Sequence, residues 1–251
     1  MTLTGRLVAL GLGAAAVFAV ATLPASLLVT RLESHGLQAT GVAGSIWNAR
    51  IASLAWRGTP LGSVHWRVGL RPLLRGRLGG HVELGRPDGR LTAEIGVSPG
   101  GEIHVAAARA TLPLEAFAAL PTGLPKGWRG RLQANVDELV LSKGLPVRAR
   151  GSLDVDDLVA PPPRNAAIGS YRLVLPDPRT PDAVGLSARI ADKSGPLGVD
   201  ARLTVAPDRS FLLEGTVLAR PDLPQAMQRS MEILGPADAQ GRRPFSVGGT
   251  L

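Results

Sequence analysis

The residues that could do chemistry are few, and three aspartates form the densest group among them. Asp154, Asp156 and Asp157 stand close together in the sequence. Alternating carboxylates open the loops that bind calcium, but such loops also need a central glycine and a distal glutamate, and both are missing here. Strand alternation would place Asp154 and Asp156 on one polar face. The pattern therefore favours a solvated strand edge over a metal site.

The histidines do not form a recognisable metal site either. None of them has a second histidine or a carboxylate at a helical ligand spacing such as His-Glu-x-x-His. Three of them fall on the polar faces of expected strands, where a solvated imidazole is the usual outcome. We therefore expect no metal ligand among His35, His65, His81 and His104.

No nucleophile can be assigned from the sequence. The chain has no cysteine, which excludes a thiol nucleophile and a thiolate metal site. It has no Gly-x-Ser-x-Gly elbow, and its glycine-rich stretches lack the Lys-Ser/Thr of a phosphate-binding loop. The sequence predicts a protein that is not an enzyme, with no catalytic residue and no cofactor.

The net charge of +8 comes almost entirely from arginine, since Lys126, Lys143 and Lys193 are the only lysines. Such a surface could meet anionic lipid head groups or acidic partners. The arginines are scattered singly, however, which indicates that their number reflects the codon composition of the genome rather than a binding surface. No basic run is interleaved with aromatic residues, so we expect no nucleic-acid partner.

The elements that would position these residues are predominantly strands. The 31 glycines and 21 prolines are spread along the chain, and apolar residues alternate with polar ones, as in an antiparallel sheet covered on one face. We predict a mainly β fold, a curved antiparallel sheet of roughly ten strands with two short helices over 112–120 and 223–234. The clearest strand runs are 63–70, 77–84, 91–98, 103–107, 147–156, 171–175, 184–190, 197–205 and 211–217.

An uncharged apolar run over 7–29 precedes the strands. As a helix it would rise roughly 34 Å, enough to cross a hydrocarbon core of roughly 30 Å. We predict one transmembrane helix that stays uncleaved. The alternative is a signal peptide cut after Ala14–Ala16 or Ala19–Ala21, but the apolar run continues beyond both.

The expected topology is single-pass in the cell inner membrane. Residues 1–6 would be cytoplasmic, and the β-domain would be periplasmic in a Gram-negative cell. The absence of cysteine does not exclude that compartment.

We predict that the β-domain itself falls into two halves, 30–160 and 161–251. Ala160-Pro161-Pro162-Pro163 marks the break, which is either a loop within one sheet or a linker between two. Each half carries a proline-led helical segment followed by a strand, so we predict an internal duplication.

One ordered set of short motifs resembles a known family. It begins with Gly44-Ser45-Ile46-Trp47-Asn48, continues with a strand that carries Trp66, and reaches a Pro72-Leu73-Leu74 turn. Later members of the set lie at 127–130, 168–171, 195–197, 234–235 and 249–251. This order resembles protein N of the bacterial type II secretion system over nearly the whole chain. The residues that we single out as family-motif or structural are Gly44, Ser45, Trp47, Asn48, Trp66 and Trp128.

The resemblance implies an inner-membrane accessory component that exports folded proteins, with other type II secretion components as partners. It also implies kinship with AsmA-like proteins, whose curved sheets have an apolar concave face. A lipid-binding groove that shields acyl chains in outer-membrane biogenesis or lipid transport is therefore the rival hypothesis. A scaffold would bury its apolar stripe in a closed core, whereas a lipid groove would leave it lining an open trough. The stripe consists of Val64, Val82, Ile95, Leu186 and Val199.

Overall fold

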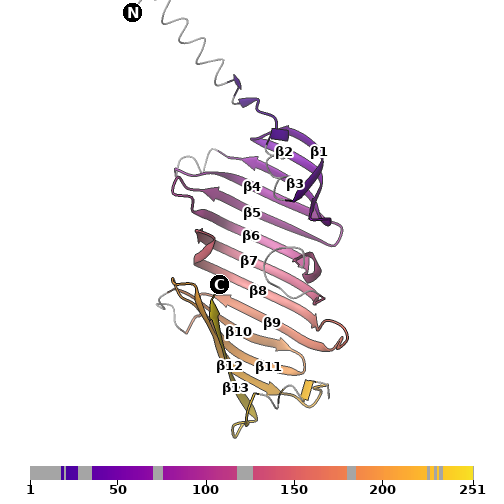
Figure 1. The fold of residues 1–251 in the computed structure, drawn as a ribbon, viewed down its shortest axis with the longest axis vertical. Coiled ribbons are helices and arrows are strands. Elements are labelled where there is room, and N and C mark those ends of the chain that lie inside the picture. The colour runs from indigo at the N-terminus through magenta and orange to yellow at the C-terminus, as the bar shows by residue number, and fades with distance from the viewer. Residues whose placement is uncertain are drawn as a thin grey trace, which may run out of the picture. The chain divides into compact units, whose positions relative to one another are not determined.

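The computed structural model describes residues 18–19, 21–27, 36–69, 76–117, 127–179, 185–224, 227–228, 231 and 234–250. These residues form thirteen strands (Figure 1). The chain divides into two compact units, Met1–Pro87 and Asp88–Leu251. The prediction of a mainly β protein is confirmed.

The first unit contains a meander of four antiparallel strands. They are β1 (Leu37–Ser45), β2 (Asn48–Trp56), β3 (Thr59–Val68) and β4 (Leu78–Arg86). The sequence prediction missed β1, because its glycines and small residues give no clear apolar alternation. Its pairing with β2, whose Ala49 and Ile51 are buried, compensates for this weak local pattern.

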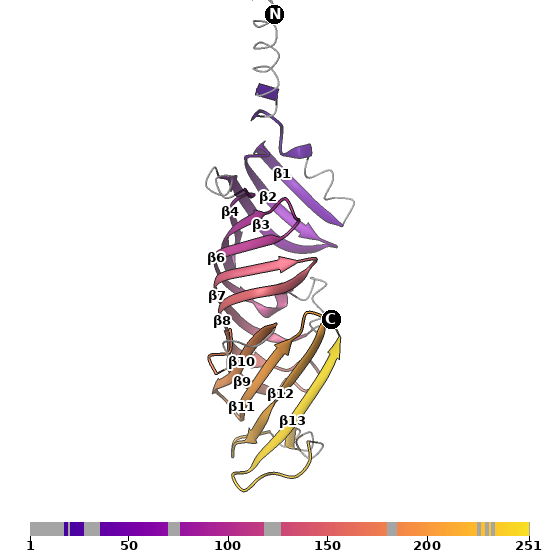
Figure 2. The ribbon, with the colours of Figure 1, turned by 90° about the vertical axis from the view of Figure 1, so that its left-hand side faces the viewer.

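The second unit contains nine antiparallel strands in chain order (Figure 2). Each strand pairs with the next, so that the strand order in the sheet follows the chain order. The strands are β5 (Gly89–Val97), β6 (Ile103–Pro113), β7 (Arg129–Ser142), β8 (Leu145–Val159), β9 (Ala167–Leu175), β10 (Leu186–Ser194), β11 (Leu197–Val205), β12 (Ser210–Ala219) and β13 (Arg242–Thr250).

The register of the second unit aligns an apolar row of residues across its nine strands, next to a row that is polar except at Ala191 and Pro244. Because successive residues point to opposite faces, two neighbouring rows of paired residues define an apolar face and a polar face. The apolar row is Leu91, Ala110, Ala134, Leu153, Leu173, Ile190, Ala201, Gly215 and Phe245. The polar row is Arg90, Thr111, Gln133, Asp154, Arg172, Ala191, Asp200, Thr216 and Pro244.

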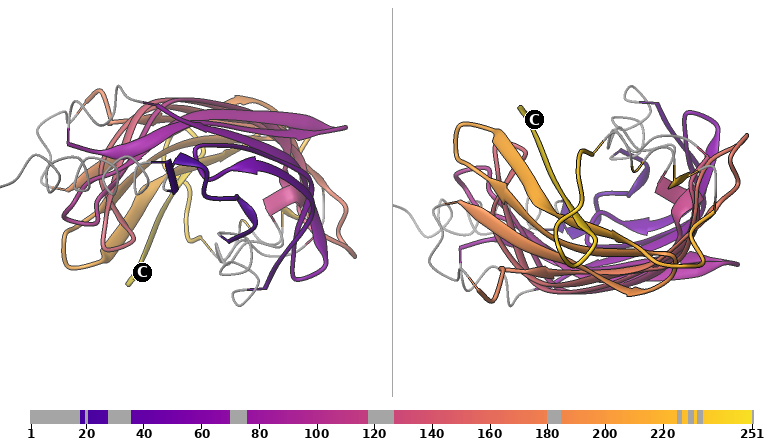
Figure 3. Two further views of the ribbon diagram at one scale, coloured as in Figure 1. Left: turned by 90° about the horizontal axis from the view of Figure 1, so that it is seen from above. Right: turned by 90° about the horizontal axis from the view of Figure 1, so that it is seen from below.

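The apolar side chains are only partly covered. Those that are fully buried among the described residues are mostly alanines, with Ile51, Leu112 and Leu223 among the few larger ones. Seen end-on, the strands of each unit are bent rather than flat (Figure 3). The predicted stripe is half-buried at every position, rather than sealed in a closed core: Val64, Val82, Ile95, Leu186 and Val199.

The first predicted helix, over 112–120, is wrong at its start. Leu112 and Pro113 belong to β6, where they pair with Leu132 and Arg131 of β7. Only the single 3₁₀ turn η1 (Leu114–Phe117) follows. The sheet pairing thus overrides a local sequence that favours a helix. Residues 118–120 lie outside the described residues.

The second predicted helix, over 223–234, is represented by three helical residues, Met227, Gln228 and Met231. The backbone N–H groups of Met227 and Gln228 both donate to the carbonyl oxygen of Pro224. Leu223 and Pro224 themselves are not helical. The intervening residues 225–226, 229–230 and 232–233 lie outside the described part of the chain.

Most of the predicted anchor over 7–29 also lies outside the described residues. No helix within the described ranges is long and apolar enough to cross a bilayer. Leu23 and Pro24 are not helical, and Pro24 forms an isolated antiparallel bridge with Ser45. The predicted helix is therefore interrupted near its far end, since proline has no N–H with which to continue the helical ladder.

The segment Ala160–Pro163 is a connection within one sheet. It joins β8 to β9, which are paired with each other, so the first of the two sequence alternatives holds. The division into 30–160 and 161–251 by internal duplication stays a prediction. The boundary between the two compact units falls elsewhere in the sequence, between Pro87 and Asp88.

Candidate functional site

The Gly44–Asn48 motif forms the tip of the β1–β2 hairpin. Ser45 pairs with Asn48, and Ile46 and Trp47 form the two-residue turn between them. Gly44 has a φ of +100°, and a Cβ at this position would overlap the carbonyl oxygen of Asn48. Position 44 therefore needs glycine, both for its positive φ angle and for the close approach of β2.

Residues of β3 are hydrogen-bonded to this hairpin tip. The indole N–H of Trp66 donates to the carbonyl oxygen of Ile46 at 2.9 Å. The backbone N–H of Val68 donates to the carbonyl oxygen of Trp47 at 2.7 Å, and a ring nitrogen of His65 lies 3.1 Å from Oδ1 of Asn48. The structure thus brings five of the six singled-out residues together.

The segment that precedes the sheet is bound to the same hairpin tip. The backbone N–H of Ile46 donates to the carbonyl oxygen of Leu23 at 2.9 Å, and that of Ala25 donates to Gly44 at 3.1 Å. Ala25 is fully buried. The end of the predicted anchor is therefore hydrogen-bonded directly to the β1–β2 turn.

Trp128, the sixth residue, lies in the second unit, on the wall of an apolar cavity of about 520 Å³. Two methionines from the segment after β12 form another wall, and methionine adapts well to varied apolar ligands. Arg164 is the single charged residue among the described residues of the lining. The lining consists of Trp128, Ala160, Pro161, Pro162, Pro163, Arg164, Ala166, Ile168, Leu197, Val217, Met227, Met231 and Leu234.

One residue of the lining, Ile168, is hydrogen-bonded through its backbone to a half-buried tyrosine. The hydroxyl of Tyr171 donates to the carbonyl oxygen of Ile168 at 2.9 Å. Burial, assisted by the negative charge of Asp192, raises the pKa of Tyr171 to about 12. The hydroxyl therefore stays protonated and serves as a structural donor rather than as a base.

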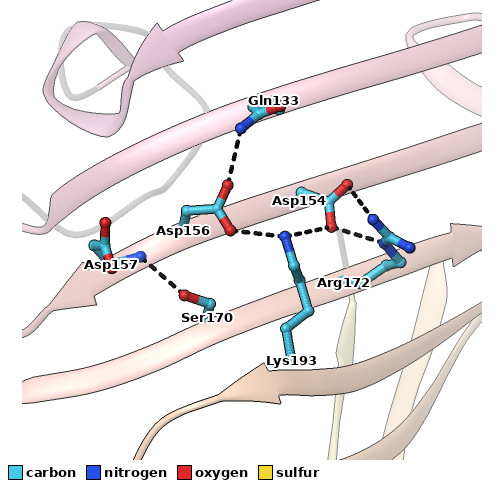
Figure 4. Close-up of polar contacts among 7 residues, drawn as sticks. All are labelled: Gln133, Asp154, Asp156, Asp157, Ser170, Arg172 and Lys193. Carbon is cyan, nitrogen blue, oxygen red and sulfur yellow. Dashed lines mark hydrogen bonds and ion pairs between the residues drawn. The ribbon is translucent and has the colours of Figure 1, made fainter.

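Two carboxylates of the aspartate cluster, those of Asp154 and Asp156, are paired with cations (Figure 4). Asp154 accepts two hydrogen bonds from Arg172, at 2.7 and 3.1 Å. Nζ of Lys193 lies 3.2 Å from Asp154 and 2.8 Å from Asp156. The hydrogen bond from Arg172 is the main cause that lowers the pKa of Asp154.

Asp156 and Asp157 each have a further hydrogen bond to a neighbouring strand. Gln133 donates to Asp156 at 3.0 Å, and the backbone N–H of Asp157 donates to Oγ of Ser170 at 3.1 Å. Within the described residues, no group of three acidic, histidine or cysteine side chains could hold a metal ion. The cluster is an ion-pair network between strands. Its cationic partners were missed because the Asp154–Arg172 register depends on the folded sheet.

A second network surrounds Asp177, whose exposed fraction is only 1%. It accepts hydrogen bonds from Nε of Arg202 at 2.7 Å and from the backbone N–H of Arg179 at 2.9 Å. Burial by itself would raise the pKa of Asp177, but these two donors outweigh it and the pKa is lowered. Asp177 is therefore a buried, paired carboxylate with a structural role.

The comparisons with known proteins concern nearly the whole chain. The family model described as "Type II secretion system (T2SS), protein N" matches residues 35–246. A type II secretion system protein N from Vibrio cholerae is 26% identical over 237 residues, which are 91% of each chain. The protein of that name from Aeromonas hydrophila is 26% identical over 93% of each chain.

A third relative carries the same name. The protein N from Pectobacterium carotovorum is 23% identical over 91% of this chain and 90% of its own. No solved structure matches the chain. Because the family model matches most of the chain, from β1 into β13, the chain belongs to the type II secretion system protein N family.

Proposed function

We propose that this protein is a non-catalytic accessory component of type II secretion that acts through protein contacts in the periplasm. The observation that carries the proposal is the family match over residues 35–246. The chemistry of the described residues supports a binding role, since the acidic cluster around Asp154 is occupied by Arg172 and Lys193. Its partners would be other type II secretion components.

We further propose that the protein is held in the inner membrane by the apolar run over 7–29. Its far end supports this arrangement, because Leu23 and Ala25 are hydrogen-bonded to the β1–β2 turn. A helix that ends there would hold the hairpin at the membrane surface without a flexible linker. Protease treatment of spheroplasts should digest the β units, whereas their protection until the inner membrane is opened would contradict this topology.

The contact role can be tested by crosslinking in cells. A photo-reactive amino acid would replace Val97, Val147 or Val247, which are exposed apolar residues on three different strands. We expect at least one position to capture an identified component of the secretion machinery when secretion is active. Labelling that captures no such component from any of the three positions would contradict the proposal.

A second candidate function is the binding of lipid acyl chains, which the half-buried apolar face favours. The cavity beside Trp128 continues that face and has a suitable volume for a ligand. The exposed Arg164 at its edge provides a positive charge for an anionic head group. Acyl chains would then lie against the methionine wall.

A photo-reactive fatty acid tests this second candidate on the full chain in detergent. We expect labelling of the segment that holds Met227 and Met231. Ile168 lines the cavity, whereas Ala167 beside it is exposed and does not, so I168E should abolish labelling and A167E should not. Equal labelling of both variants would exclude the cavity as the site.

A further inference from the structure

The last strand, β13, leaves one side of its backbone unpaired in the second unit. Among the described residues it pairs only with β12, without any irregularity in register. Its residues Ser246 to Thr250 are all exposed, with Val247 at 52%. Such an edge is a template for an additional strand unless the protein protects it.

The backbone groups that face outward can be identified from the hydrogen bonds of Arg242. Its N–H donates to Oδ1 of Asp238 at 2.8 Å, and its C=O accepts from the N–H of Asp238 at 2.8 Å. Both groups therefore point away from β12, and alternation places those of residues 244, 246, 248 and 250 on the same side. Pro244 fits this assignment, since proline is tolerated where the missing N–H would face outward.

The outer edge is consequently divided into a protected half and an open half. The outward backbone groups of Arg242 are already hydrogen-bonded to Asp238, and Pro244 has no N–H that could donate to an added strand. Ser246, Gly248 and Thr250 present outward N–H and C=O groups, and no described residue bonds to them. The first strand, β1, differs from β13 in this respect, because backbone groups of Leu23 and Ala25 are hydrogen-bonded at its end.

The two faces of β13 set the chemistry of an added strand. Phe245 and Val247 pair with Gly215 and Leu213 on the apolar face, whereas Ser246 lies on the polar face. Arg242, at the start of β13, is exposed and forms no ion pair with the described residues. A complementary strand therefore alternates apolar and polar residues and carries a carboxylate near Arg242.

We propose that β13 binds an extended segment of a partner protein, which adds antiparallel to Ser246–Thr250 and ends in acidic residues next to Arg242. Antiparallel addition continues the pattern of the sheet. It places the acidic residues at the C-terminal end of the added strand. This inference rests on the proposed role in protein contacts, and it specifies the edge and the partner's chemistry.

The test uses the full chain in detergent and a fluorescein-labelled peptide that alternates valine with threonine and ends in two glutamates. Peptide binding should slow hydrogen exchange at the amides of Ser246, Gly248 and Thr250, but not at Val247, which already bonds to β12. S246P removes one outward N–H and should weaken binding at least about tenfold. S246A keeps the backbone and should bind as the original chain does.

The charge assignment has its own exchange test. R242E should bind a peptide ending in two lysines more tightly than the glutamate peptide, which reverses the original preference. Hydrogen exchange on the unaltered chain keeps the test decisive even where S246P fails to fold. Binding that leaves the three amides unprotected, or no binding at all, would overturn the inference, as would β13 paired with β13 of a second copy. Loss of secretion in a deletion strain would still support the proposed function separately.

Discussion

The indole N–H of Trp66 lies 2.9 Å from the carbonyl oxygen of Ile46 and ties β3 to the tip of the β1–β2 hairpin. Trp56, on β2 of the same unit, offers a contrast: its buried indole N–H has no hydrogen-bond partner among the described residues. The two tryptophans therefore form a matched pair that separates the hydrogen bond from the aromatic ring.

Replacing Trp66 by phenylalanine should lower the free energy of unfolding by about 1 kcal/mol more than the same change at Trp56. W66F leaves the carbonyl of Ile46 without its donor, whereas W56F removes a donor that is already unsatisfied. Chemical denaturation of both variants measures the difference. Equal losses would show that the Trp66 hydrogen bond contributes nothing to stability.

Gly44 should tolerate alanine much less well than Gly58. Both residues have positive φ angles, so each substitution should cost about 1–2 kcal/mol in backbone strain. At Gly44 the new Cβ also meets Asn48, whereas the space around Gly58 is open. Thermal unfolding should therefore show a clearly larger loss for G44A, and similar melting temperatures would contradict the close approach at the hairpin tip.

Asp177 should contribute stability that disappears in acid. Its pKa is lowered in the folded state, so its contribution is present above the unfolded pKa of about 3.9 and is lost as pH falls through the folded pKa. D177N should cost about 2 kcal/mol at neutral pH, where the ionised carboxylate bonds Arg202. Unfolding measured against pH should show this cost shrinking below about pH 4.

An exposed aspartate serves as the control for that profile. Asp208 also has a lowered pKa, from its hydrogen bonds to Ser210, but it lies at the surface. D208N should therefore cost less than D177N at neutral pH. A D177N cost that stays constant down to pH 2 would refute the ion-pair account.

Calcium should not bind to the aspartate cluster. Lys193 already joins Asp154 to Asp156, and a cation would have to displace it. Calorimetric titration with calcium should give no binding heat, and a chelator should leave the melting temperature unchanged. Saturable calcium binding that is lost in D154N would contradict the ion-pair assignment.

The strands could be predicted because their apolar alternation is local. Val64, Trp66 and Val68 lie on β3 as their spacing indicated. β1 could not be predicted in this way, since its LQATGVAGS sequence becomes a strand through pairing with β2. The helix expected at Leu112 failed for the same reason: the pairing of Leu112 with Leu132 is absent from any local window.

The candidate sites show the same division. The Gly44–Asn48 motif was recognisable as a sequence, but its attachment to Leu23 depends on the folded hairpin. Trp128 was recognisable as a motif residue, but its surroundings were not. The cavity that it lines includes residues as distant in sequence as Leu234. Contacts between residues distant in sequence are the part that a single sequence does not contain.

The proposed role in secretion can be tested by following an exported substrate in cells. The gene would be deleted in a strain that uses type II secretion, and the exported substrate would be quantified in the periplasm and in the medium, with and without the full chain restored. We expect substrate to accumulate in the periplasm of the deletion strain and to return to the medium on restoration. Undiminished export without the protein would contradict the proposed role.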